Sequence, residues 1–138
     1  MADTFVYEIR MVFDSVRLGG AIYDINHVTN KRTQKQNLCC YDAMVAHRKG
    51  IYCYQYFNGD GHHDSFWTKR RGEMNRGAHT FRLTHGGNRI YCYFDGEFVD
   101  SYRIGKVRRV HTFGKWGWMI RGTGRFKVDS LMVLGKKQ

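Results

Sequence analysis

The hydrophobic residues of this chain alternate with polar ones at a period of two. The N-terminal segment places five apolar side chains on one side: Phe5, Tyr7, Ile9, Met11 and Phe13. Glu8 and Arg10 fall on the other side. A period of two is typical of a strand with one buried face. Residues 80–84 repeat the pattern, which predicts that Phe81 and Leu83 point inward.

Two segments carry the same tetrapeptide, Ile-Tyr-Cys-Tyr, at residues 51–54 and 90–93. Both are rich in residues that favour strands. Alternation predicts that Cys53 and Cys92 are buried as free thiols in the core. Three tyrosines of the first segment share the opposite face: Tyr52, Tyr54 and Tyr56. The flanking sequences differ, so we interpret these as two strands with one pattern and not as a duplication.

Turn residues separate the strand-like segments. Proline is absent, so tight turns depend on glycine, asparagine and aspartate. Asp95-Gly96 predicts a hairpin, and Gly86-Gly87-Asn88 predicts a second turn just before it. Further strands are expected at 21–25, 116–120 and 126–134, with a long exposed loop at 26–38. The segment 38–46 fits a strand or one helical turn, and the strand is favoured because no later segment shows a sustained period of 3.6. Roughly nine to eleven short strands with regular turns predict an all-β sandwich or barrel.

Length, charge and cysteine content narrow the class of protein. A chain of 138 residues predicts one domain spanning residues 1–138. The formal net charge of +11 fits either a polyanionic partner or a merely basic surface. The four cysteines form no CxxC pair, so no zinc site of the usual spacing is indicated, and free thiols fit a reducing compartment. Without a signal-peptide run or an apolar stretch of ~18 residues, we expect a cytoplasmic protein with no membrane span.

The order of segments in the C-terminal third carries a family resemblance. A Gly-Gly-Asn turn leads into RIYCYFDGEFV at 89–99, a basic connector follows, and the chain closes with GWMIRGTGRFKVDSLMV at 117–133. This order resembles the C-terminal half of the concanavalin A-like lectin/glucanase superfamily. In length and stand-alone form the chain is most similar to galectins. The resemblance implies an antiparallel β-sandwich of the jelly-roll, concanavalin A-like kind.

The galectin resemblance also implies a sugar site. Galectins bind sugar with a His and an Arg on one strand, an Asn on the next, and a Trp followed by Glu and Arg. The residues of matching type, with one tyrosine added, are His47, Arg48, Tyr54, Asn58, Trp67, Arg71 and Glu73. Such rings and planar polar groups suit the C–H faces and hydroxyls of a glycan. The His47–Asn58 interval is short and Arg71 precedes Glu73, so galactoside specificity is not carried over. The alternative is that Trp67 and the tyrosines pack in the sandwich.

Arginine-rich segments support a second hypothesis, the binding of nucleic acid or an acidic polymer. Cationic side chains contact phosphates, and exposed tyrosines stack on bases. The candidates form two groups in the chain: Arg70, Arg71 and Arg76, then Arg103, Lys106, Arg108 and Arg109. The aromatic signature of RNA-recognition motifs is absent from the sequence.

Metal binding and hydrolysis are disfavoured by spacing. The loop with the most ligand-type side chains lacks the alternation of a calcium loop: Asn58, Asp60, His62, His63 and Asp64. Glycosidases need two carboxylates flanking the bond that they cleave. The close carboxylates of this chain, Asp95, Glu97 and Asp100, begin with a turn residue and are better explained by turn chemistry.

We therefore expect a non-catalytic, lectin-like carbohydrate-binding module with a glycan as its partner and with neither metal nor cofactor. Two alternatives stay open. One is a basic protein that binds nucleic acid or an acidic polymer. The other is a structural or assembly jelly-roll protein, such as a domain that forms a homodimer.

Overall fold

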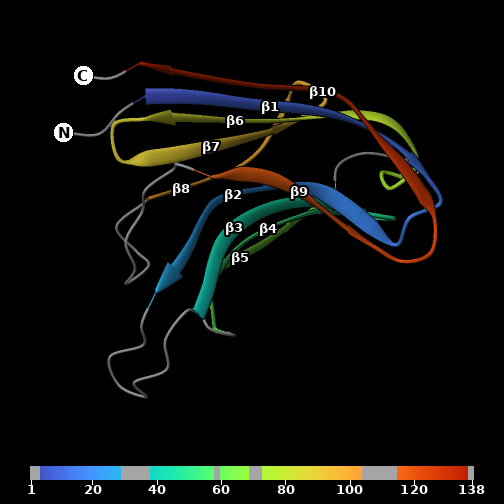
Figure 1. The fold of residues 1–138 in the computed structure, drawn as a ribbon, viewed down its shortest axis with the longest axis horizontal. Coiled ribbons are helices and arrows are strands. Elements are labelled where there is room, and N and C mark those ends of the chain that lie inside the picture. Colours follow the sequence, from blue (N-terminus) through green and yellow to red (C-terminus); the bar gives the residue numbers. More distant parts are fainter. Residues whose placement is uncertain (1–3, 29–37, 58–59, 69–72, 104–114, 137–138) are drawn as a thin grey trace.

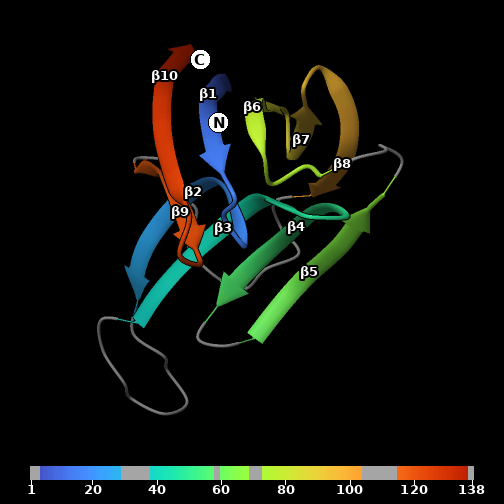
Figure 2. The same ribbon diagram turned by 90° about the vertical axis from the view of Figure 1, so that its right-hand side faces the viewer.

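Two five-stranded antiparallel sheets form a β-sandwich. The structure is a computed structural model that describes residues 4–28, 38–57, 60–68, 73–103 and 115–136, with only the backbone at 26–28, 38–40, 55–57, 60–64 and 136. The first sheet has the order β10-β1-β6-β7-β8 and the second the order β5-β4-β3-β2-β9. Figure 2 shows the two sheets as separate layers.

Ten strands make up the described part of the chain. In the first sheet they are β1 (Thr4–Asp14), β6 (Gly77–Gly86), β7 (Arg89–Phe94), β8 (Glu97–Arg103) and β10 (Arg125–Lys136). In the second sheet they are β2 (Leu18–Val28), β3 (Leu38–His47), β4 (Gly50–Phe57), β5 (Asp60–Trp67) and β9 (Trp116–Arg121). The all-β sandwich predicted from the alternation is confirmed.

The hydrophobic core lies between the sheets, where the alternation predicted it. All five apolar residues of β1 that share one face are buried: Phe5, Tyr7, Ile9, Met11 and Phe13. Phe81 and Leu83 of β6 meet them from the neighbouring strand of the same sheet. From the second sheet, Met44 and Ile51 complete the same cluster. Removing such side chains from water is the main force that holds two sheets together.

The Asp95-Gly96 turn between β7 and β8 forms as predicted. Both residues have positive φ, 49° at Asp95 and 83° at Gly96, as a two-residue hairpin turn with the twist of its strands requires. Asp95 also accepts a hydrogen bond from the Thr80 backbone N–H at 2.7 Å and pairs with His79 at 2.7 Å. Asp95, the first of the three close carboxylates, is therefore part of a turn that hydrogen bonds join to β6.

A polar cluster lies inside the core. The Tyr102 hydroxyl donates to Asp42 at 2.9 Å, so the neighbouring Tyr23 hydroxyl donates to the oxygen of Tyr102. Burial raises the pKa of both phenols, and the nearby Asp42 carboxylate raises that of Tyr102 further. Tyr23 and Asp42 belong to the second sheet and Tyr102 to the first, so this hydrogen-bonded chain crosses the interlayer.

Three sequence-based expectations concern the connections. The exposed loop predicted at 26–38 is wrong at its ends, because β2 continues to Val28 and β3 starts at Leu38. β2 is also longer than the predicted 21–25, since pairing with both β3 and β9 supports its whole N-terminal half. Residues 29–37 and most of the basic connector, 104–114, lie outside the described residues. No helix in the described part of the chain is long and apolar enough to cross a membrane.

Candidate functional site

The outer face of the second sheet carries a group of ring-bearing side chains. Because Ile51 and Cys53 of β4 point into the core, the residues between and after them point outward. Register places Tyr52 beside Val45 and Phe66, and Tyr54 beside Ala43. Residues that are paired across antiparallel strands share a face. We call this surface the aromatic face, and define it by five residues: Tyr41, His47, Tyr52, Tyr54 and Phe66.

Three rings form a row across β3, β4 and β5. The ring centroids of Tyr52 and Phe66 are 4.4 Å apart, and those of His47 and Tyr52 are 6.2 Å apart. Tyr52 is 37% exposed and Phe66 43% exposed. The Tyr52 and Phe66 rings are inclined by 44°, and the His47 ring meets Tyr52 edge-on at 82°. Aromatic rings in contact that also remain open to solvent offer an apolar platform to a ligand. This row is the most accessible part of the aromatic face.

Small side chains lie beneath the centre of the face. Ala43 and Val45 of β3 are buried on this outer side, and neither belongs to the core cluster between the sheets. Figure 1 shows β2 and β3 arching, with the concave side turned away from the first sheet. A curved sheet with small residues in the middle lets side chains lean across it. The face is therefore shaped by its sheet as well as by its rings.

Tyr54 crosses this centre and contacts β9. Its hydroxyl donates to the Met119 sulfur at 3.9 Å, over the two intervening strands. Tyr41 packs edge-on against Tyr54 with centroids 6.0 Å apart. Burial is the largest cause that raises the pKa of Tyr54 above its ordinary value, and the Tyr41 hydroxyl adds to it, while Arg121 acts in the opposite direction. The Tyr54 hydroxyl is therefore neutral and able to donate at physiological pH.

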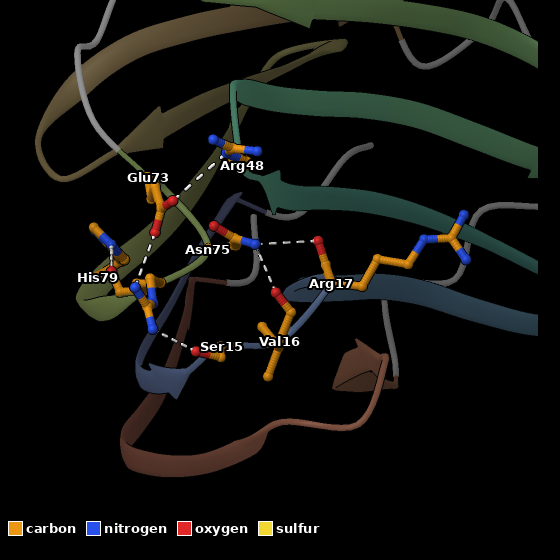
Figure 3. Close-up of polar contacts among 8 residues, drawn as sticks. Ser15, Val16, Arg17, Arg48, Glu73, Asn75 and His79 are labelled. Carbon is orange, nitrogen blue, oxygen red and sulfur yellow. Dashed lines mark hydrogen bonds and ion pairs between the residues drawn. The ribbon is translucent and has the colours of Figure 1, made fainter.

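A polar pocket adjoins the face at the turn between β3 and β4. Its volume is about 210 Å³. It is lined by six residues, which we call the arginine pocket: Ser15, Val16, Arg48, Glu73, Asn75 and Arg76. Figure 3 shows these side chains converging from the β1–β2 turn, the β3–β4 turn and the segment before β6. Arg48 follows His47 of the aromatic face directly in the chain.

Glu73 lies at the centre of the charges in this pocket. One carboxylate oxygen is 3.5 Å from Arg48 Nε and the other is 3.2 Å from Arg76 Nη1. Arg76 also donates to the Ser15 hydroxyl at 2.6 Å, so both sides of its guanidinium are held. Asn75 donates to the Val16 carbonyl at 2.6 Å. These bonds tie three separate segments into one arrangement, which Figure 3 draws as dashed lines.

Met74 anchors the segment that carries the pocket residues. Its side chain is 2% exposed and belongs to the core cluster, although both of its neighbours in the chain are polar. Its backbone N–H donates to the Arg48 carbonyl at 3.3 Å. Burying one apolar side chain between two polar ones therefore fixes Glu73 and Asn75 at the end of the sandwich.

The structure divides the residues predicted from the sequence. His47 and Tyr54 lie on the aromatic face, while Arg48 and Glu73 meet in the arginine pocket. Trp67 does not join them, because it pairs with Ile51 and packs against the core from the inner side of β5. Asn58 and Arg71 lie outside the described residues. The seven residues therefore do not gather into one galectin-type site among those described.

Several residues of the site were missing from the sequence-based set. Tyr52 and Phe66 are the exposed part of the ring row, whereas the galectin resemblance predicted Trp67 as the aromatic residue of the site. Alternation along β4 and β5 was the available signal, since residues that pair with an outward tyrosine must also point outward. Nothing in the sequence indicated Asn75 or Ser15, because their contacts join segments that are far apart in the chain.

The close carboxylates do not belong to this site. Asp100 accepts a hydrogen bond from Ser65 at 2.9 Å and Asp95 is bound in its turn. Both belong to the β7–β8 hairpin of the first sheet. The prediction that this set reflects turn chemistry is confirmed for Asp95. Among the exposed and half-buried residues whose side chains the structure describes on the second sheet, none is a carboxylate.

No family model and no curated protein matches the sequence. Solved structures do match the fold. Sheep galectin-11, in complex with glycerol, superposes with a TM-score of 0.60 at 9% identity, covering 97% of this chain and 92% of that one. The galectin LEC-6 of Caenorhabditis elegans gives 0.59 at 10% identity over 94% of this chain and 81% of that one.

Two enzymes are similar in fold as well. A native glycosidic hydrolase gives a TM-score of 0.53 at 18% identity over 83% of this chain, and the alginate lyase AlgAT5 gives 0.51 at 12% identity over 99%. The chain spans 50% of the length of the hydrolase and 61% of that of the lyase. Identities this low establish the fold alone. The chain has the concanavalin A-like lectin/glucanase fold, which lectins share with carbohydrate-cleaving enzymes.

Proposed function

We propose that this protein is a non-catalytic, glycan-binding module that binds its ligand on the aromatic face. The observation that carries the proposal is the row formed by His47, Tyr52 and Phe66, in which the Tyr52 and Phe66 rings remain open to solvent. Sugar rings present flat C–H faces that stack on such a platform, and their hydroxyls need polar partners at its edge. The arginine pocket supplies those partners beside His47.

The absence of catalysis is part of the proposal. A glycosidase of the usual kind needs two carboxyl groups, roughly 5–9.5 Å apart, on either side of the bond. The exposed and half-buried residues whose side chains are described on the second sheet include no carboxylate, and Glu73 is held between two arginines. Glycan binding without turnover therefore fits the described residues better than hydrolysis does.

A glycan array with wild type and one double variant tests this proposal. We expect Tyr52→Ala with Phe66→Ala to lower binding at least tenfold, because the stacking platform is removed. Phe98→Ala is the matched control, since Phe98 is 54% exposed and packs against a tyrosine on the first sheet at 5.9 Å. Equal binding by the double variant and the wild type contradicts the placement, and binding to no glycan contradicts the function.

The net charge of +11 supports one second candidate, a protein that binds nucleic acid. Its affinity for single-stranded DNA should then fall steeply with salt, by about 0.7 logarithmic units per phosphate contacted for each tenfold rise in salt concentration. A flat salt dependence contradicts that candidate. The arginines that first supported it lie partly outside the described residues, whereas the aromatic face lies within them.

A further inference from the structure

We propose that the glycan is acidic, and that Arg48 binds its carboxylate or sulfate group at the arginine pocket. This inference rests on the proposed function and names the class of ligand for the same site. It follows from three observations: the balance of charge, the unused donors of Arg48, and the position of the pocket beside the ring row.

The charge around the site is positive. In the arginine pocket two arginines face one glutamate, Glu73, whose carboxylate contacts both of them. Two further positive charges lie near the site: Lys49 is exposed in the same turn as Arg48, and Arg121 lies at the end of β9. A neutral sugar would leave this excess of positive charge uncompensated, whereas an acidic sugar would neutralise part of it.

The two arginines of the pocket have different contacts. The Arg76 guanidinium contacts Glu73 through one terminal nitrogen and Ser15 through the other, so it holds the Glu73 carboxylate in place. Arg48 meets Glu73 through Nε alone, and within the described part of the chain its two terminal amino groups have no partner. Its side chain is 66% exposed. A guanidinium with its terminal N–H groups open to solvent can bind a carboxylate or sulfate through two parallel hydrogen bonds.

The position of Arg48 fits a ligand that also stacks on the rings. Arg48 follows His47, and the His47 ring begins the row that continues through Tyr52 to Phe66. A sugar lying on this row would have one edge near the β3–β4 turn, whose residue Arg48 lines the pocket. An acidic substituent at that edge would reach Arg48 while the ring stays on the aromatic platform. Stacking and charge would thus be satisfied by one residue of the glycan.

Nucleic acid shares the anionic chemistry but fits the described geometry less well. Binding of a single strand usually combines a cationic groove along the backbone with several bases stacked in succession. Here one short row of three rings lies beside one pocket, and the described cations of that pocket and of the β3–β4 turn are Arg48, Lys49 and Arg76. These observations favour a single acidic sugar unit at the site.

The test compares matched acidic and neutral glycans on one array. The probes are polygalacturonate with its methyl-esterified form, heparin with its desulfated form, and sialylated with desialylated oligosaccharides. In about 150 mM salt, within the ordinary physiological range, we expect the wild type to bind the acidic member of at least one pair about tenfold more tightly. We expect Arg48→Gln to reduce this preference to within about threefold, and Arg48→Lys to restore part of it.

Controls separate this inference from the proposed function. Arg125→Gln removes an exposed arginine of β10 on the first sheet and should leave the preference unchanged. Thermal melting of Arg48→Gln reports whether the pocket still folds. Equal binding of both members of every pair, or a preference that Arg48→Gln leaves intact, overturns the acidic-ligand inference while glycan binding stands. Failure to bind any glycan overturns both, and tighter binding of oligo-dT than of every acidic glycan replaces the inference with nucleic-acid binding.

Discussion

The two Ile-Tyr-Cys-Tyr segments occupy similar positions in opposite sheets. In β4 of the second sheet, Ile51 and Cys53 are buried, and in β7 of the first sheet Ile90 and Cys92 are buried. The predicted free, buried thiols are confirmed at Cys53 and Cys92. The neighbouring Cys92 thiol is the largest cause that raises the pKa of Cys53, and burial adds to it, so the two segments approach one another in the core.

The outer faces of these segments differ because their neighbours differ. Beside Tyr93 of β7 lies Arg82, which pairs with Glu8 at 3.8 Å. Beside Tyr52 of β4 lie Val45 and Phe66. On its other side Tyr93 meets the Phe98 ring, with centroids 5.9 Å apart. The same tyrosine pattern therefore joins a mixed charged and aromatic surface in one sheet and a row of three rings in the other. A strand's own sequence determines which residues are buried, whereas the character of its exposed face depends on the strands beside it.

The inner positions should show the largest and most similar effects. Ile51→Ala and Ile90→Ala each remove a fully buried side chain. Each should lower the free energy of unfolding by about 2–5 kcal/mol, because the shorter side chain buries less apolar surface and leaves a cavity behind. Urea denaturation measures both. If one of the two variants loses less than about 1 kcal/mol of unfolding free energy, the two segments do not contribute equally to the core.

The polar cluster between the sheets should show a smaller effect. Tyr102→Phe removes the hydroxyl that donates to Asp42, and leaves the Tyr23 hydroxyl without its acceptor. We expect a loss of about 1–3 kcal/mol in the free energy of unfolding. Tyr93→Phe is the control, since that ring lies on the outside of the first sheet. Equal stability of the two variants would show that the interlayer hydrogen bonds contribute nothing.

Stability should fall in alkaline solution. Burial is the largest cause that raises the pKa of four tyrosines in the folded chain: Tyr7, Tyr23, Tyr54 and Tyr102. Unfolded tyrosine ionises near about pH 10. The pKa of these tyrosines is higher in the folded state than in the unfolded state, so they stabilise the folded state. This contribution to stability is complete below about pH 10 and is lost as the pH rises from there through the folded-state pKa values. The free energy of unfolding, measured by urea denaturation across this pH window, should decline as the pH rises. In Tyr54→Phe it should decline less steeply with pH. Stability that stays constant or rises would contradict the assignment.

The outer tyrosines should differ in binding and hardly at all in stability. Tyr52→Ala on β4 and Tyr91→Ala on β7 should each change the free energy of unfolding by about 1 kcal/mol or less, since neither ring belongs to the core. Glycan affinity, measured by titration calorimetry, should fall about tenfold in Tyr52→Ala and remain at the wild-type value in Tyr91→Ala. Loss of affinity in both would place the ligand elsewhere.

The sequence contained more information about the fold than about the site. Alternation in β1 and β6 predicted Ile9 and Phe81 as core residues, because the side-chain period of a strand is fixed by its backbone. It also predicted the Asp95-Gly96 turn, whose positive φ values few residues adopt. The site depends on register between strands and on contacts between distant segments. Phe66 meets Tyr52 only because β5 pairs with β4 in one register, and a shift by one residue would have exposed Trp67 in its place.

The terminal strands lie side by side, far from the ring row. Thr4 of β1 pairs with Lys136 of β10, and Figure 1 shows that β1 begins and β10 ends at the same end of the first sheet. The aromatic face belongs to the other sheet and is turned away from it. Copies joined in tandem through their termini would therefore be linked at a point away from the aromatic face. With flexible linkers that span neighbouring sites on a polymer, such a concatemer would bind about 10²–10⁴ times more tightly than one copy without any new contact.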